Sequence, residues 1–126
     1  MEYEMELQNR ESIFVVDDDQ GILDSFDAML GDDYPLHMVD NGMDALAFLE
    51  RHQPCLMFLD LKMPHMNGLE LLKNLAARNL STVIVVVTAL PQDEYEEQAR
   101  KYGVYKYLRK PLDVDEVEDI ASVILH

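Results

Sequence analysis

Several polar side chains suited to metal and phosphoryl chemistry stand directly after apolar segments of this sequence. They are Asp17, Asp18 and Asp19 after the first segment, Asp60 after another, Thr88 at the end of a third and Lys110 after a fourth. Carboxylates held close together repel one another and favour a cation, and Mg²⁺ prefers oxygen ligands that it can share with a phosphate. A lysine ammonium and a threonine hydroxyl can bind phosphoryl oxygens, and an aspartate carboxylate can itself become phosphorylated. These residue types therefore favour metal-assisted phosphoryl transfer onto a carboxylate.

The apolar segments that precede these residues are predicted β-strands, and amphipathic helices alternate with them. The predicted strands cover residues 12–16, 35–39, 56–59, 82–87 and 105–109. Apolar residues recur at spacings of three and four in the intervening segments, which is the pattern of a helix with one buried face. Continuous apolar strands need cover on both faces. The sequence therefore predicts an α/β fold: a doubly wound, five-stranded parallel sheet with helices on both faces and right-handed crossovers.

The carboxyl ends of parallel strands lie at one edge of a sheet, and open α/β sheets bind ligands there. Because Asp17, Asp60, Thr88 and Lys110 all follow or end predicted strands, we expect them to converge at this edge. Their joint placement is the main reason to interpret them as a site, since each of them alone is more often an ordinary turn or surface residue.

Length and composition bound the classes of protein to be considered. The chain has 126 residues, 10 Lys and Arg against 25 Asp and Glu, and a formal net charge of −15. This charge argues against direct binding to nucleic acid or to an anionic membrane. The single cysteine excludes an internal disulfide, and the longest apolar run, residues 83–87, is too short to span a membrane. We expect a cytoplasmic protein with an N-terminal extension, residues 1–11, and one domain, residues 12–126.

The residues around the predicted site resemble the receiver domain of two-component response regulators. The resemblance rests on Val-Val-Asp-Asp-Asp at 15–19, Leu-Asp-Leu-Lys-Met-Pro at 59–64 with Asn-Gly at 67–68, Val-Val-Thr-Ala at 86–89, and Tyr-Leu-Arg-Lys-Pro at 107–111. Each motif alone is weak, but all four occur in order on the ends of the expected strands. The resemblance implies a flavodoxin-like sheet with strand order 2-1-3-4-5.

The resemblance also implies roles for individual residues. Asp60 would be the phosphoryl acceptor. Asp18, Asp60 and the backbone carbonyl of Lys62 would hold Mg²⁺, with Asp17 acting mainly through water.

Other implied roles concern the phosphoryl oxygens and the switch. Thr88 and Lys110 would contact the phosphoryl oxygens, Tyr107 would be an aromatic rotamer switch, and the Lys110–Pro111 peptide would be cis. Movement of Thr88 toward the phosphoryl group would carry the loop 89–91 with it and vacate space for Tyr107. The face that changes would comprise the helix ending near Arg100, the strand 105–109 and the last helix.

The implied partners are a histidine kinase or phosphotransfer protein as phosphoryl donor and a downstream protein or output domain on the changing face. Formation of a dimer on phosphorylation is one use of that face. The acidic segments that flank the face, including residues 113–119, could also select a partner with a basic patch.

Two other functions stay open from the sequence. A magnesium phosphatase of the haloacid dehalogenase type also uses an aspartate nucleophile at a strand end, but it has a second aspartate two residues later, where this chain has Lys62. A receiver-like interaction module that is never phosphorylated is the third class. The complete set of acidic residues, threonine and lysine argues against it.

Overall fold

The computed structural model describes residues 11–63, 68–78, 80–89 and 92–125. Strands and helices alternate along these residues. In chain order they are β1 (Ile13–Val16), α2 (Gln20–Leu30), β2 (Leu36–Val39), α3 (Gly42–Arg51), β3 (Leu56–Leu59), α4 (Gly68–Ala77), β4 (Val83–Thr88), α5 (Gln92–Lys101), β5 (Lys106–Arg109) and α6 (Val114–Leu125). Each predicted strand is present, with bounds within one residue of the prediction. Of the predicted extension, only Glu11 lies among the described residues.

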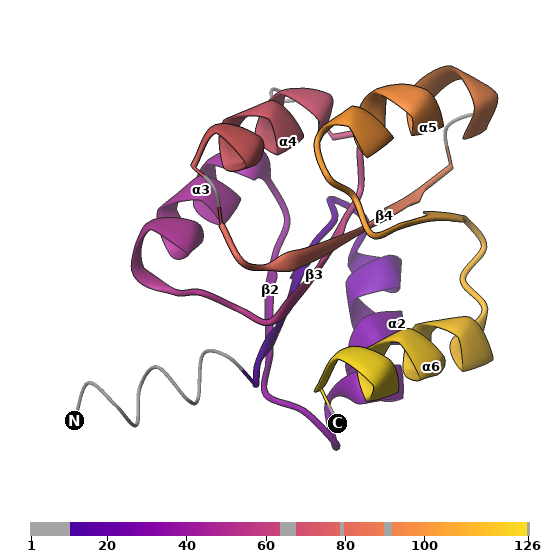
Figure 1. Cartoon of the computed structure of the whole chain (residues 1–126). Helices are drawn as coiled ribbons and strands as arrows, with labels where there is room; N and C mark the ends of the chain where they lie inside the picture. The colour runs from indigo at the N-terminus through magenta and orange to yellow at the C-terminus, as the bar shows by residue number, and fades with distance from the viewer. Residues whose placement is uncertain (1–10, 64–67, 79, 90–91, 126) are drawn as a thin grey trace.

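The strands form one parallel sheet in the order β2-β1-β3-β4-β5 (Figure 1). This confirms the predicted doubly wound α/β fold and its strand order. The central strands β1 and β3 are buried along their whole length, as their uninterrupted apolar sequences require.

Helices cover both faces of the sheet. Alternate residues of β1 point to opposite sides, so Phe14 and Val16 join the core under α3, α4 and α5, whereas Ile13 and Val15 join the core under α2 and α6 (Figure 1). The two core clusters hold the sheet between them and fix the positions of its carboxyl ends.

The start of α2 is determined by a local signal. Asp19 has an extended backbone, and its carboxylate accepts a hydrogen bond from the Gly21 N–H at 2.8 Å, which makes it the N-cap. The helix ends at Leu30, and Gly31 after it has a right-handed φ of −63°. None of the helices in the described residues is long and apolar enough to cross a membrane.

Candidate functional site

The carboxyl ends of β1 and β3 bring two buried aspartates together. Val16 and Leu59 are partners in the parallel register, and Asp17 and Asp60 are the residues that follow them. Their exposed fractions are only 2% for Asp17 and 4% for Asp60. A buried carboxylate needs a counter-charge or hydrogen-bond donors, so the surroundings of this pair determine what it can do.

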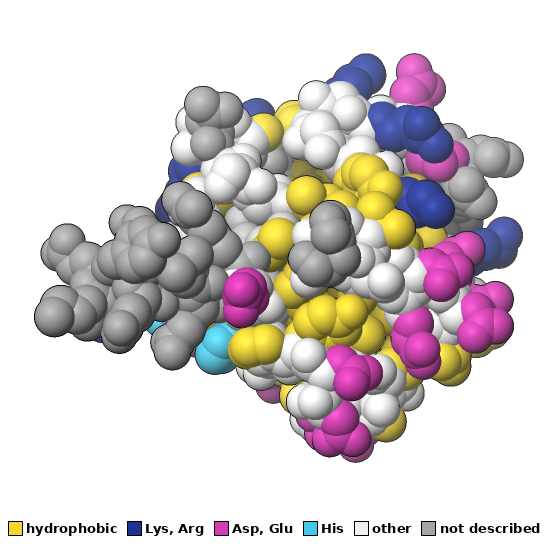
Figure 2. Space-filling model, turned by 60° about the horizontal axis from the view of Figure 1, so that its bottom comes forward, with side chains coloured by type: hydrophobic (Ala, Val, Ile, Leu, Met, Phe, Trp, Pro, Cys, Tyr) yellow, Lys and Arg dark blue, Asp and Glu magenta, His cyan; other side chains and the backbone are white. Residues whose placement is uncertain are grey.

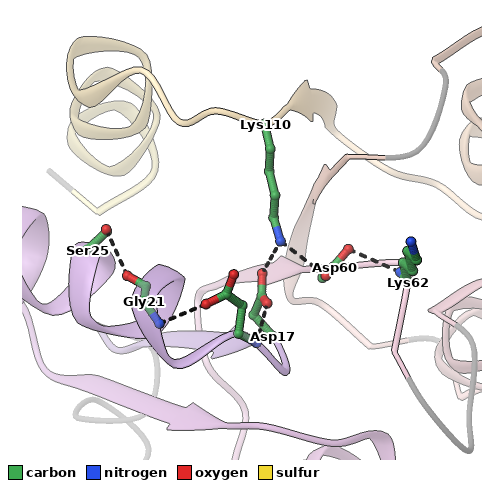
Figure 3. A network of polar contacts seen from close by, with 7 residues as sticks. Asp17, Gly21, Ser25, Asp60, Lys62 and Lys110 are labelled. Atoms are coloured by element: carbon green, nitrogen blue, oxygen red, sulfur yellow. Dashed lines mark hydrogen bonds and ion pairs between the residues drawn. The ribbon is translucent and has the colours of Figure 1, made fainter.

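Lys110 supplies the counter-charge. Its Nζ lies 2.9 Å from Asp17 Oδ2 and 3.2 Å from Asp60 Oδ2, and Figure 3 shows the ammonium between the two carboxylates. Lys110 directly follows β5, two strands away from β3, so this contact joins distant segments of the chain. The Lys110–Pro111 peptide is cis, as the family resemblance implies.

Backbone N–H groups hold the other oxygens of the two carboxylates. The Asp19 N–H donates to Asp17 Oδ1 at 2.9 Å, and the Lys62 N–H donates to Asp60 Oδ1 at 3.1 Å (Figure 3). Both oxygens of Asp17 are therefore engaged. The three consecutive aspartates have different positions: Asp17 is buried, Asp18 is exposed and Asp19 caps a helix.

Burial makes this site electrostatically demanding. Burial raises the pKa of Asp17 above its ordinary value of 3.8, and the charge of Asp60 adds to the rise, against the lowering effect of the Asp19 N–H and Lys110. Burial of Lys110 lowers its pKa, but its hydrogen bond to Asp17 and the charges of both aspartates outweigh burial and leave the pKa above 10.5. Lys110 therefore carries its positive charge at neutral pH.

The carboxylates also form a set of oxygens that suits a divalent ion. One oxygen from each of Asp17, Asp18 and Asp60 lies within 4.8 Å of the others. An all-oxygen set of acidic groups that opens to solvent fits Mg²⁺, which keeps part of its water shell. The adjoining pocket measures about 710 Å³, and its lining includes Asp18, Asp60, Lys62, Met63, Ala89 and Lys110.

Thr88 and Tyr107 lie on the neighbouring strands. Thr88 is the last residue of β4 and is fully buried, while Ala89 after it is the residue that lines the pocket. Tyr107 pairs with Val86 in the register of β4 and β5 and packs against the core under α3, α4 and α5. The remainder of the predicted moving loop, residues 90–91, lies outside the described residues.

Tyr107 has a buried polar atom without a partner. Among the described residues, its Oη is the buried side-chain polar atom that has no hydrogen bond. Burial raises the pKa of Tyr107, and the nearby acidic groups Glu96, Tyr95 and Asp60 raise it further, while Arg109 lowers it. The ring is thus held in a position that satisfies packing but not hydrogen bonding.

Gly68 is a supporting residue whose contact the sequence pattern does not indicate. Its N–H donates to the Leu61 carbonyl at 2.8 Å, and a Cβ at this position would collide with Leu61 Cα and lie 2.8 Å from the Asp60 carbonyl oxygen. Only glycine lets the start of α4 lie this close to the backbone that carries Asp60. The Asn-Gly pair at 67–68 marks a turn, but no local pattern indicates the residue that it approaches.

Comparison with known proteins agrees with this geometry. Residues 13–122 match the family described as the response regulator receiver domain, so the chain belongs to that family. The general function of these domains in two-component systems is that of a phosphorylation-controlled switch, and they bind Mg²⁺ through acidic residues. They are signalling modules rather than enzymes in the usual sense, which disfavours the phosphatase alternative.

Individual relatives differ in how much of their length the chain covers. Sporulation initiation phosphotransferase F of Bacillus subtilis is 29% identical over 116 residues, which are 91% of this chain and 94% of the relative. Response regulator Rre1 of Synechocystis is 33% identical over 118 residues, 90% of this chain but 51% of the relative. Regulatory protein AtoC of Escherichia coli is 30% identical over 113 residues, 87% of this chain and 24% of the relative.

Solved structures show the same fold. The CheY-like receiver domain protein of Methanospirillum hungatei has a TM-score of 0.83 at 28% identity and covers 90% of this chain and 93% of its own. The receiver domain of an HD domain-containing protein of Pseudomonas fluorescens has a TM-score of 0.84 at 28% identity, covering 92% and 94%.

Proposed function

We propose that Asp60 accepts a phosphoryl group from a histidine kinase or a phosphotransfer protein. The observation that carries this assignment is the Lys110 ammonium bound by both Asp17 and Asp60 at the rim of an open acidic pocket. In the transfer, a carboxylate oxygen of Asp60 forms the new O–P bond as the N–P bond of the donor phosphohistidine breaks. The electron pair of that bond stays on the histidine nitrogen.

The residues around Asp60 divide the remaining tasks. Asp18, Asp60 and the Lys62 carbonyl would hold Mg²⁺, and Asp17, whose oxygens accept from Lys110 and Asp19, would contribute through water. Bound Mg²⁺ supplies positive charge that offsets the carboxylates and the incoming phosphoryl group. Lys110 then exchanges its contact with the Asp60 carboxylate for one with a phosphoryl oxygen.

The switch links this charge to the surface of α5, β5 and α6. A hydrogen bond from Thr88 to a phosphoryl oxygen draws the end of β4 toward the site, and Tyr107 on the neighbouring β5 turns into the space that is vacated. Moving a two-state equilibrium from 1:99 to 99:1 needs roughly 5.5 kcal/mol of differential stabilisation. Two or three charge-assisted hydrogen bonds at roughly 1.5–3 kcal/mol each are sufficient. A downstream protein or output domain, or a second copy on dimerisation, then binds the changed face.

The acceptor can be tested with a small phosphodonor. The wild-type chain, Asp60→Asn and the control Asp33→Asn, an exposed aspartate outside the site, are incubated with acetyl phosphate with and without Mg²⁺. We expect the mass of one phosphoryl group on the wild type and on Asp33→Asn only with Mg²⁺, and none on Asp60→Asn. Peptide mapping should place it on Asp60.

Two results would favour the rival functions. An unmodified wild-type chain that also fails to bind beryllofluoride with Mg²⁺ would indicate a constitutive interaction module. Continuous release of phosphate from small phosphate esters would indicate a phosphatase.

A further inference from the structure

A groove on the α5–β5–α6 face has an acidic rim and exposed apolar side chains. It measures about 310 Å³ and lies between the start of β5 and the outer surface of α6. Tyr105 and Val123, which are 50% and 60% exposed, lie along it, and Ile120 is buried at its base. On the side of the molecule drawn in Figure 2, Asp and Glu side chains gather next to exposed hydrophobic ones.

The acidic rim comes mainly from α6. Asp113, Asp115, Glu116 and Asp119 all line the groove, against a single cation, Lys106 at the start of β5. Within the described part of the chain, ion pairs join Arg100 to Glu96 and Lys110 to the two site aspartates, and these rim carboxylates have no cationic partner there.

Stabilisation of α6 explains only some of these acidic residues. The Asp113 carboxylate accepts from the Glu116 N–H at 3.3 Å, and Asp115 and Glu116 complement the positive end of the helix from its first turn. Asp119 lies one turn further, four residues after Asp115 and three after Glu116, where like charges destabilise a helix. A cation from outside the chain would relieve this repulsion.

We propose that this groove binds a basic amphipathic helix of a partner protein, with Lys or Arg along the acidic rim and aliphatic side chains against Tyr105 and Val123. The proposal deepens the proposed function, on which it rests for the assignment of α5–β5–α6 as the output face. Charge complementarity selects the occupant: the groove combines an apolar base with unpaired carboxylates, which match the two faces of such a helix. A second copy could offer Lys106 and Arg109 of its β5, but each copy has a net charge of −15, so two copies repel each other.

The test compares two variants of equal net charge. The groove variant is Asp115→Asn, Glu116→Gln and Asp119→Asn. The control variant, Asp40→Asn, Asp44→Asn and Glu50→Gln, removes three exposed carboxylates away from the groove. Asp40 follows β2, and Asp44 and Glu50 belong to α3, which packs on the face of the sheet opposite to α6; Asp44 is likewise a first-turn acid. The probe is a synthetic helical peptide of about 15–18 residues with Leu on one face and Lys on the other.

Affinity for the probe is measured by calorimetry at two salt concentrations, and the binding surface is mapped by amide chemical shifts. We expect the groove variant to bind the peptide about tenfold more weakly than the control variant, since three rim ion pairs are lost. Shifts should be confined to β5 and α6, and a Leu-to-Ser version of the peptide should bind weakly. Equal loss in both variants would mean binding by net charge alone and would overturn the proposal.

Two further measurements distinguish peptide binding in the groove from self-association and from phosphorylation at Asp60. Sedimentation of the wild type alone tests the second copy: a dimer that the groove variant abolishes would replace the peptide as the occupant and overturn the proposal. Asp60→Asn should bind the probe like the unphosphorylated wild type, because the groove carboxylates are intact. A chain that is not phosphorylated on Asp60 can therefore still bind the peptide in the groove, and a chain that does not bind the peptide can still be phosphorylated on Asp60.

Discussion

Replacing Lys110 with methionine removes the cation between Asp17 and Asp60 but keeps a side chain of similar length. At an effective dielectric constant of about 20, the attractions at 2.9 and 3.2 Å are each roughly 5–6 kcal/mol before desolvation is counted. Desolvation of the lysine offsets much of this sum, and removal of one partner from a buried ion pair typically costs about 3–5 kcal/mol. We expect Lys110→Met to lower the free energy of unfolding by about 3–5 kcal/mol in the absence of Mg²⁺.

Mg²⁺ should reverse much of the loss, because it supplies positive charge to the same carboxylates. Urea unfolding followed by circular dichroism, with and without Mg²⁺, measures both effects. Ligand at about 100 times its Kd stabilises a fold by roughly 2.7 kcal/mol, and the gain should be larger in the variant, where no ammonium competes for the carboxylates.

Lys106→Met is the matched control, because Lys106 is an exposed lysine at the start of β5, the strand that Lys110 follows. It should unfold at the same urea concentration as the wild type. Equal stability of Lys110→Met and the wild type, or equal stabilisation of both chains by Mg²⁺, would refute this role of Lys110.

Other contacts of the described residues lead to four more expected outcomes. Gly68→Ala should weaken Mg²⁺ binding measured by calorimetry, because the added Cβ displaces the backbone at Asp60. Gly103→Ala is the control: its φ of +82° makes alanine strained there, but no neighbour lies within 4 Å. It should lose about 1 kcal/mol of stability and bind Mg²⁺ normally. Tyr107→Phe should raise the free energy of unfolding by about 1 kcal/mol in urea, since it removes a buried hydroxyl without a partner; a loss would contradict this. Asp18→Asn should stabilise the Mg²⁺-free chain by about 1 kcal/mol and weaken Mg²⁺ binding, because it removes a like charge within 4.8 Å of Asp17 and Asp60. The pKa values of Lys110 and Tyr107 are raised, so the folded chain holds both protons more tightly than the unfolded chain does. Stability is therefore at its full value below the ordinary pKa values of 10.5 and 10.0 and falls as pH rises through the higher folded values. Unfolding curves between about pH 9 and 12 should show the fall, and it should be shallower in Tyr107→Phe.

The fold was predictable because its strands carry an unambiguous signal. The runs at 13–16 and 56–59 are apolar at every position, and such segments are stable only with both faces covered, which limits the architecture to a sheet between two layers of helices. Convergence of Asp17, Asp60 and Lys110 followed from the same reasoning, since parallel strands end at one edge.

The division of roles among neighbouring residues was less predictable. Asp17, Asp18 and Asp19 are chemically identical, and only the turn of the backbone after β1 decides which one is buried, which is exposed and which caps α2. A capping residue before a helix is a local signal that could have assigned Asp19. The bridging position of Lys110 and the approach of Gly68 to Leu61 depend on how separate segments pack, and no spacing within one segment encodes them.

The site carries a stability cost that the proposed function would use. Burial raises the pKa of Asp17, so the folded chain holds a carboxylate at a position that penalises its charged form. Lys110 offsets only part of this repulsion, because one ammonium faces carboxylates from Asp17 and Asp60, with Asp18 close by. A fully neutralised site would be more stable but would gain little from an added cation or a transferred phosphoryl group. In the proposed function, this uncompensated charge is what would let phosphorylation of Asp60 change the balance between two arrangements of β4 and β5, because a ligand shifts such a balance only by binding one arrangement better than the other.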